Sequence, residues 1–180
     1  MNSFLELVQK RQSDRAYLQR DIETDKLDRI LEAGRLAPSA CNGQPWKMIV
    51  IRDEKIRNEV AATTSDIIVS SNHFTRQAPV QIVIVEESSN LSSKAGSWAK
   101  SKHFPHFDLG ILAAHLCLAA ADEGLGSCIV GWFDEKKLRK VLEIPKEKRP
   151  VLIIVVGYSA QKTRQKIRKE KSQVISENKY

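Results

Sequence analysis

The chain has 180 residues, of which 42% are hydrophobic and 28% are charged, and its formal net charge is +7. This length suffices for one domain with a sizeable core, and the composition is that of a soluble globular protein. The three cysteines lack Cys-x-x-Cys spacing, which excludes a disulfide framework and a zinc motif built from cysteine pairs. We therefore expect a single domain over residues 1–180 in a reducing cytoplasm.

The first half of the chain alternates between helical and strand patterns. Apolar residues at helical spacing predict helices over residues 4–11 and 24–37, the second with Thr24 as its N-cap. A strand pattern covers residues 46–52. Asp53 then caps a third helix, whose apolar pattern fades toward Val69.

The second half carries the most apolar segments of the chain. A strand rich in β-branched residues is predicted over residues 79–86. Residues 87–107 have no clear pattern and suggest an excursion over the surface, with or without a short helix. Asp108 is predicted to cap a long apolar helix that ends at Gly124; its apolar run is too short for a membrane span, so it indicates a buried core helix. The remaining predicted elements are a strand over 127–132, a helix over 134–142 and a strand over 150–158.

This interleaving of about five helices and four strands predicts a mixed α/β sandwich. The order of the elements is not a simple βαβ series. The chain has neither a Gly-x-Gly-x-x-Gly segment after a first strand nor a P-loop, so neither of these nucleotide sites is supported.

The segment over residues 38–46, Pro-Ser-Ala-Cys-Asn-Gly-Gln-Pro-Trp, is the first candidate site. Its two prolines stiffen both ends of a loop between a helix and a strand. Asn42 and Gln44 each offer donors and an acceptor, which suits the edge of a flat heterocycle that carries both C=O and N–H groups. An ordinary helix-to-strand connection has the same residue types.

Two basic segments form a second candidate site. In an extended segment, Arg11, Ser13 and Arg15 point the same way, and arginine forks match phosphate oxygens. Residues 160–171 carry six cationic side chains against one glutamate, and among them Lys166 and Arg168 share a face if extended. Charged linkers and solvated tails have the same pattern. A third candidate is Gly131, at a strand end, which would allow a ligand to approach the backbone.

Taken together, these segments resemble the FMN-dependent nitroreductase family. The resemblance extends over nearly the whole chain. It rests on Arg11-x-Ser13-x-Arg15, on Ala37-Pro38-Ser39-Ala40-x-Asn42-x-Gln44-Pro45-Trp46, on Asp108-Leu109-Gly110, on Gly124-Leu125-Gly126-Ser127, on Gly131-Trp132-Phe133-Asp134, on Gly157-Tyr158 and on Lys166-x-Arg168.

The resemblance implies an α+β fold with a central, mostly antiparallel sheet of four to five strands flanked by helices. It also implies a homodimer with FMN at the subunit interface and a C-terminal tail exchanged with the partner. The activity that it implies is NAD(P)H oxidation by ping-pong hydride transfer through flavin N5 to a flat acceptor such as a nitroaromatic, quinone or enone. No acid–base dyad or nucleophile is expected, because the cofactor carries the chemistry.

The resemblance also assigns a cofactor-binding role to specific residues. Those expected at the phosphate, ribityl chain and pyrimidine side are Arg11, Gln12, Ser13, Arg15, Lys166 and Arg168. Those expected to line the flavin ring, some from the second subunit, are Pro38, Ser39, Ala40, Asn42 and Gln44, with the backbone of Val130 and Gly131 facing N5. Residues 103–107 are either a wall of the substrate pocket or surface filler.

Two other functions fit parts of the sequence. An FMN-binding dimer could act as a carrier or sensor without turnover. A small basic nucleic-acid-binding protein would use the tail, but no predicted element pairs basic residues with stacking aromatics. We therefore expect neither nucleic acid nor a membrane as a partner.

Overall fold

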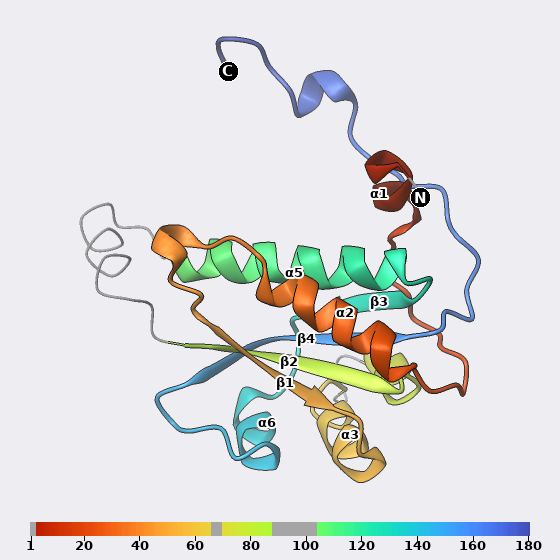
Figure 1. Cartoon of the computed structure of the whole chain (residues 1–180), viewed down its shortest axis with the longest axis vertical. Coiled ribbons are helices and arrows are strands. Elements are labelled where there is room, and N and C mark those ends of the chain that lie inside the picture. Colours follow the sequence, from red (N-terminus) through yellow and green to blue (C-terminus); the bar gives the residue numbers. More distant parts are fainter. Residues whose placement is uncertain (1–2, 66–69, 88–103) are drawn as a thin grey trace.

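The computed structural model describes residues 3–65, 70–87 and 104–180 (Figure 1). Its centre is a four-stranded sheet with the order β1-β2-β4-β3, in which every neighbouring pair is antiparallel. The strands are β1 (Trp46–Ile51), β2 (Val80–Glu86), β3 (Gly126–Val130) and β4 (Arg149–Gly157). The predicted α+β class is confirmed, and each predicted strand is present within two residues of its expected ends.

Strands β2 and β4 form the centre of the sheet, and β1 and β3 are its two edges. Successive side chains of a strand point to opposite faces, so a central strand feeds two cores. In β2, Ile82 and Ile84 enter the core on one face, whereas Val83 and Val85 enter the core on the other. This explains why β2 reads as a continuous apolar run in the sequence.

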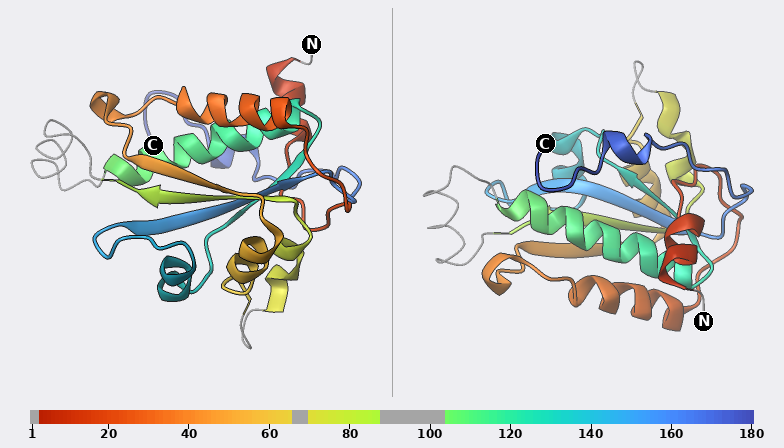
Figure 2. Two further views of the ribbon diagram at one scale, coloured as in Figure 1. Left: turned by 60° about the horizontal axis from the view of Figure 1, so that its bottom comes forward. Right: turned by 90° about the horizontal axis from the view of Figure 1, so that it is seen from above.

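Five α-helices lie among the described residues. Two of them, α2 and α5, cover one face of the sheet, and α3 and α6 cover the other, so the molecule has three layers (Figures 1 and 2). The helices are α1 (Phe4–Lys10), α2 (Thr24–Arg35), α3 (Glu54–Ala61), α5 (Phe104–Asp122) and α6 (Glu135–Val141). Short 3₁₀ turns occur at Ala40–Asn42, Ser70–Arg76 and Lys171–Gln173.

Helix α5 is long and apolar enough to cross a membrane by length and composition. Its buried side chains include Leu109, Leu112 and Leu116, which pack between α2 and the sheet. The apolar character of α5 is therefore accounted for by its place in the core, as the sequence predicted.

Several helix ends agree with the predicted caps. The Asp53 side chain accepts a hydrogen bond from the Ile56 amide at 2.9 Å, which places it at the N-cap of α3. Gly124 follows α5 with φ of +75°, the left-handed conformation that favours glycine after a helix. The predicted extension of the third helix toward Val69 lies outside the described residues.

Two predicted N-caps are wrong. Helix α2 has Glu23 as its N-cap, without a side-chain cap bond, and Thr24 is already inside the helix. Helix α5 begins at Phe104, so Phe104–Phe107 belong to its first turn and not to a surface excursion. Asp108 lies inside this helix and is buried. The polar residue before the apolar run looked like a cap, but Pro105 in the first turn is a better helix start.

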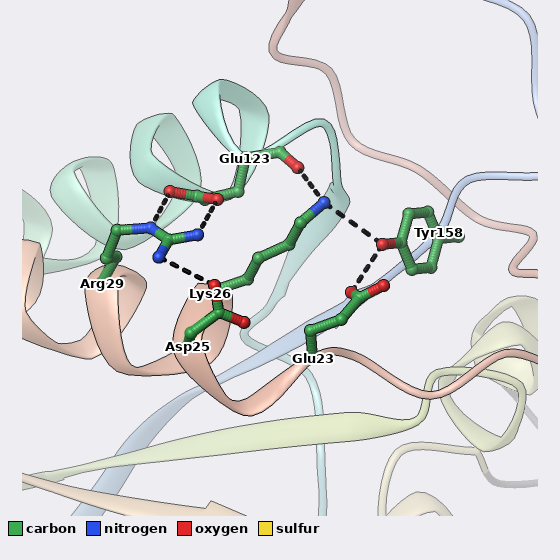
Figure 3. Close-up of polar contacts among 6 residues, drawn as sticks. All are labelled: Glu23, Asp25, Lys26, Arg29, Glu123 and Tyr158. Atoms are coloured by element: carbon green, nitrogen blue, oxygen red, sulfur yellow. Dashed lines mark hydrogen bonds and ion pairs between the residues drawn. The ribbon is translucent and has the colours of Figure 1, made fainter.

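A polar network joins α2 to the end of α5 and to Tyr158, which directly follows β4 (Figure 3). Arg29 donates to both carboxylate oxygens of Glu123 at 2.6 and 2.8 Å. Lys26 donates to the Glu123 carbonyl and to the Tyr158 hydroxyl. That hydroxyl donates to Glu23 at 2.6 Å, which is the main reason why the pKa of Glu23 is lowered to about 2. The network fixes the point at which the chain leaves β4 for the tail.

Candidate functional site

The segment after α1 runs along the start of β3. Ser13 forms a parallel bridge with Ser127, and the Asp14 amide donates to the Ser127 carbonyl at 2.9 Å. The Tyr17 hydroxyl donates to the Asp14 carbonyl at 2.9 Å, and burial raises the pKa of Tyr17. The predicted extended conformation over residues 11–15 is therefore present, held by backbone bonds to the sheet edge.

Asp14 is the buried residue of this segment. Its Oδ1 accepts hydrogen bonds from Gln12 Nε2 at 2.9 Å and from Ser159 Oγ at 2.6 Å. A Cβ placed on Gly126 would lie 2.7 Å from the Asp14 Oδ2 atom, so only glycine leaves room for the carboxylate here. The Asp14 carboxylate forms a fixed negative group beneath an otherwise basic segment.

The beginning of the tail docks on the same segment. Gln12 Nε2 donates to the Lys162 carbonyl, and Gln12 Oε1 accepts from the Arg164 amide at 3.0 Å. The Arg164 guanidinium donates to the Ser13 carbonyl at 2.7 Å, and Lys166 Nζ donates to the Arg11 carbonyl. Two segments separated by about 150 positions in the sequence are thus held side by side.

Together these two segments enclose a pocket of about 400 Å³. The residues that line it are Arg11, Gln12, Ser13, Arg15, Arg164, Gln165, Lys166, Ile167 and Arg168. Five of these nine carry a positive charge. The structure therefore brings together all six residues that the resemblance assigned to the phosphate, ribityl chain and pyrimidine side. The amide of Gln12 is already engaged with Asp14 and the tail, so its observed contacts are structural.

Arg164 was not among the predicted site residues. The signal was available, because Lys162, Arg164, Lys166 and Arg168 recur at every second position, and an extended chain places such residues on one face. The structure places three of these four in the pocket and leaves Lys162 outside it. The Arg164 guanidinium lines the pocket and also donates a hydrogen bond to the Ser13 carbonyl, which attaches the tail to residues 11–15.

The cations of the pocket repel one another. The pKa of Lys166 is lowered by its partial burial and then by the neighbouring guanidinium groups of Arg11, Arg168 and Arg164. The pocket is lined by five cationic side chains and carries an excess of positive charge. It is suited to a bound anion with several oxygens, because arginine and lysine donate charge-assisted hydrogen bonds to phosphate.

The loop between α2 and β1 forms a second, separate group. Three of its residues, none of them glycine, have positive φ: Cys41 at 52°, Asn42 at 50° and Gln44 at 43°. Each such residue costs about 1–3 kcal/mol, and such conformations cluster at functional sites. The side-chain amide nitrogen of Gln44 donates to Asn42 Oδ1 at 3.1 Å. The two side-chain amides that were predicted to contact a flat ring therefore lie together.

The loop does not line the pocket. It leads into β1, whereas the pocket is built on β3, at the opposite edge of the sheet. These edges are three strand spacings apart, which is about 14 Å. The predicted residues Pro38, Ser39 and Ala40, and the loop amides Asn42 and Gln44, are therefore not brought to the phosphate side within one chain.

Val130 and Gly131 lie at the end of β3. Val130 is buried, Gly131 is exposed and Trp132 beside it is 61% exposed. Neither Val130 nor Gly131 lines the pocket, but β3 begins beside it. From Ser127 the strand carries the chain about 13 Å to Gly131, at a rise of about 3.3 Å per residue.

Comparison with known proteins places the chain in a family. The model of the nitroreductase family matches residues 8–158. The chain belongs to the nitroreductase family. The predicted family resemblance is therefore confirmed.

Similar proteins include an oxygen-insensitive NADPH nitroreductase of Helicobacter acinonychis, 27% identical, with 85% of each chain covered. A nitroreductase family protein of Streptococcus pneumoniae superposes with a TM-score of 0.82 at 27% identity, over 97% of this chain and 99% of that one. An FMN-dependent nitroreductase of Clostridium difficile superposes with a TM-score of 0.78 at 26% identity, over 98% of this chain and 100% of that one.

Proposed function

We propose that the protein is an FMN-dependent NAD(P)H oxidoreductase of the nitroreductase type. The observation that carries this proposal is the pocket of five cationic side chains between residues 11–15 and 164–168. In a family with NAD(P)H-dependent relatives, such a pocket has the chemistry required for the phosphate of FMN.

The residues present fit this cofactor at its phosphate end. The phosphate would be held by Arg11, Arg168 and Lys166. Its negative charge would offset the repulsion among these cations. Ser13 supplies a hydroxyl for the ribityl chain. Arg15 adds a positive charge on the ring side, where it would stabilise negative charge on the reduced ring.

The arrangement of β3 favours one direction for the cofactor. Ser127 and Gly131 are about 13 Å apart along the strand. A molecule whose phosphate lies near Ser127 could therefore extend its flat ring to Gly131. Gly131 has no side chain and is exposed, so the backbone of Val130 and Gly131 would be accessible to the ring.

We further propose a homodimer with the cofactor at the subunit interface. The loop over residues 38–44 leads into β1, at the opposite edge of the sheet from β3, and its amides would meet the ring in the second subunit. Apolar side chains that a partner would cover are exposed on α1 and on the tail: Phe4 at 68%, Leu5 at 72%, Ile167 at 90% and Val174 at 62%. Beyond residue 168 the tail projects away from the sheet (Figure 1), in a position to be exchanged with the partner.

When bound, FMN would supply ping-pong hydride transfer through its N5 position between NADH or NADPH and a flat acceptor such as a nitroaromatic, quinone or enone. The chain's own side chains bind and orient the cofactor and hold positive charge near it. This division of labour is consistent with a site built from cations and amides. We place this activity in one domain over residues 1–180, in the cytoplasm.

The first test is the flavin itself. Full-length protein purified with added FMN should show flavin absorbance after gel filtration and should run as a dimer. Rapid mixing with NADH or NADPH should bleach that absorbance, and a nitroaromatic or quinone should restore it. A protein that neither retains nor binds FMN contradicts the proposal. Bound flavin that the nicotinamides do not reduce would instead favour a carrier or sensor.

A further inference from the structure

The loop over residues 39–44 combines backbone strain with a hydrogen bond to the buried side of helix α5. Its three positive φ values, at Cys41, Asn42 and Gln44, occur within four positions. Residues in such conformations persist when the surrounding structure holds them in place. The bonds that hold this loop therefore decide whether its amides keep their arrangement.

Most of the loop's described hydrogen bonds are internal. Ser39 is the acceptor for two of them, since its carbonyl accepts from the Asn42 amide at 3.0 Å and its Oγ accepts from the Gln44 amide at 2.9 Å. The Gly43 amide donates to the Ala40 carbonyl at 2.9 Å. These bonds shape the loop but do not attach it to the protein.

A hydrogen bond from the loop backbone attaches it to the core. The Ala40 amide donates to Asp108 Oδ1, inside α5, at 3.0 Å. Asp108 is only 3% exposed, and within the part of the chain that the structure describes its Oδ2 is buried without a donor. A carboxylate in an apolar helix is costly unless its oxygens are hydrogen-bonded. A mostly apolar helix thus carries a buried acidic side chain that accepts a hydrogen bond from the strained loop.

We propose that Asp108 is a positioning residue. Its carboxylate fixes Ala40, and through Ala40 it holds the strained turn that presents Asn42 and Gln44 to a flavin ring. The flavin partner rests on the proposed function, whereas the attachment of the loop by Asp108 does not. The side-chain amides of a loop attached in this way keep one orientation. Their hydrogen bonds would therefore set the absorbance and the reduction potential of the ring.

The test compares Asp108→Ala with Asp108→Asn in the full-length protein. The asparagine variant keeps an oxygen that accepts from Ala40, and its amide nitrogen takes the place of the unpaired Oδ2 atom. The alanine variant removes the acceptor. Because one hydrogen bond of this kind corresponds to about tenfold in a local equilibrium, the loop amides should exchange hydrogen about tenfold faster in Asp108→Ala.

Hydrogen exchange measured by mass spectrometry provides the first readout, with and without added FMN. The expected result is faster exchange in the peptide that covers residues 39–44 of Asp108→Ala, unchanged exchange in β2 and β4, and near-wild-type exchange in Asp108→Asn. Unchanged loop exchange in Asp108→Ala would overturn the proposal. So would faster exchange throughout the core in both variants, because that result assigns Asp108 to packing alone.

The bound flavin provides the second readout. The absorbance maxima and midpoint potential of the flavin should move in Asp108→Ala and should stay at the wild-type values in Asp108→Asn. Identical spectra and potentials in all three proteins would show that the loop does not reach the ring, and would overturn the positioning role. Failure of the wild-type protein to bind FMN would overturn the proposed function, while loop exchange would still decide whether Asp108 holds the loop.

Discussion

Removing two arginines from the cationic pocket should weaken FMN binding without weakening the fold. The variant is Arg11→Ala combined with Arg168→Ala. Charge-assisted hydrogen bonds contribute about 1.5–3 kcal/mol each. Arg11 is half-buried and Arg168 is exposed, so solvent screening favours the lower end of this range. Two bonds then amount to about 3 kcal/mol, or roughly a 100-fold increase in the Kd for FMN.

The fold itself should tolerate this change. Both guanidinium groups lower the pKa of Lys166, which means that they repel it in the flavin-free protein. Their removal relieves that repulsion, and surface substitutions of this kind change stability by about 0.5 kcal/mol or less. Urea denaturation of the flavin-free protein should therefore give nearly the wild-type midpoint.

A matched control separates a local effect from an effect of net charge. Lys169→Ala combined with Lys171→Ala also removes two positive charges, from the tail next to Arg168, but neither lysine lines the pocket. Titration of each protein with FMN, followed by quenching of flavin fluorescence, should give a large loss for the arginine pair and a small loss for the lysine pair. Equal losses in the two variants, or full flavin occupancy in the arginine variant, would refute the phosphate assignment.

Three further predictions follow from the same contacts. The pKa of Lys166 is lowered from its usual 10.5, so this side chain loses its charge below pH 10.5 and FMN affinity should fall there. Lys166→Ala should flatten this pH dependence in fluorescence titrations. An unchanged pH dependence in the variant would show that Lys166 does not contact the phosphate. The pKa of Glu23 is lowered from 4.5 to about 2, so its stabilising effect is complete above pH 4.5 and is lost as pH falls toward 2. Glu23→Gln, which keeps a hydrogen-bond acceptor for Tyr158, should reduce the acid sensitivity of urea unfolding in that window, and an identical acid profile would contradict this. Gly126→Ala should push on Asp14, destabilise the protein by about 1–3 kcal/mol and weaken FMN binding; wild-type values for both would show that the carboxylate moves freely.

The fold was largely predictable because its elements have strong local signals. The β-branched runs of β2 and β4 and the apolar run of α5 identify three central elements from the sequence alone. The order β1-β2-β4-β3 was not predictable in this way, because local periodicity says nothing about which strands become neighbours. Asp108 illustrates a different limit, since a buried acid within a helix and a capping acid before one look alike in sequence.

The candidate site was predictable where short motifs repeat a charge at every second residue. Arg11, Arg15, Lys166 and Arg168 were expected to act together, and the structure brings them to one pocket. Arg164 was missed because its alternation with Lys166 was not extended backward along the tail. The attachment of the two segments through the Gln12 amide could not be inferred, because it depends on a contact between residues about 150 positions apart.

That contact has a consequence for the synthesis of the chain. The ribosome makes residues 11–15 first, but the cationic pocket also needs residues 164–168, which follow the last strand of the sheet. The anion site is therefore incomplete until the segment after β4 has docked on residues 11–15. If this pocket holds the phosphate of FMN, as proposed, cofactor loading follows the docking of the tail, and a chain that ends after β4 would lack Arg164, Lys166 and Arg168 and would bind FMN more weakly. Flavin retention would then report that the tail had reached its docked position.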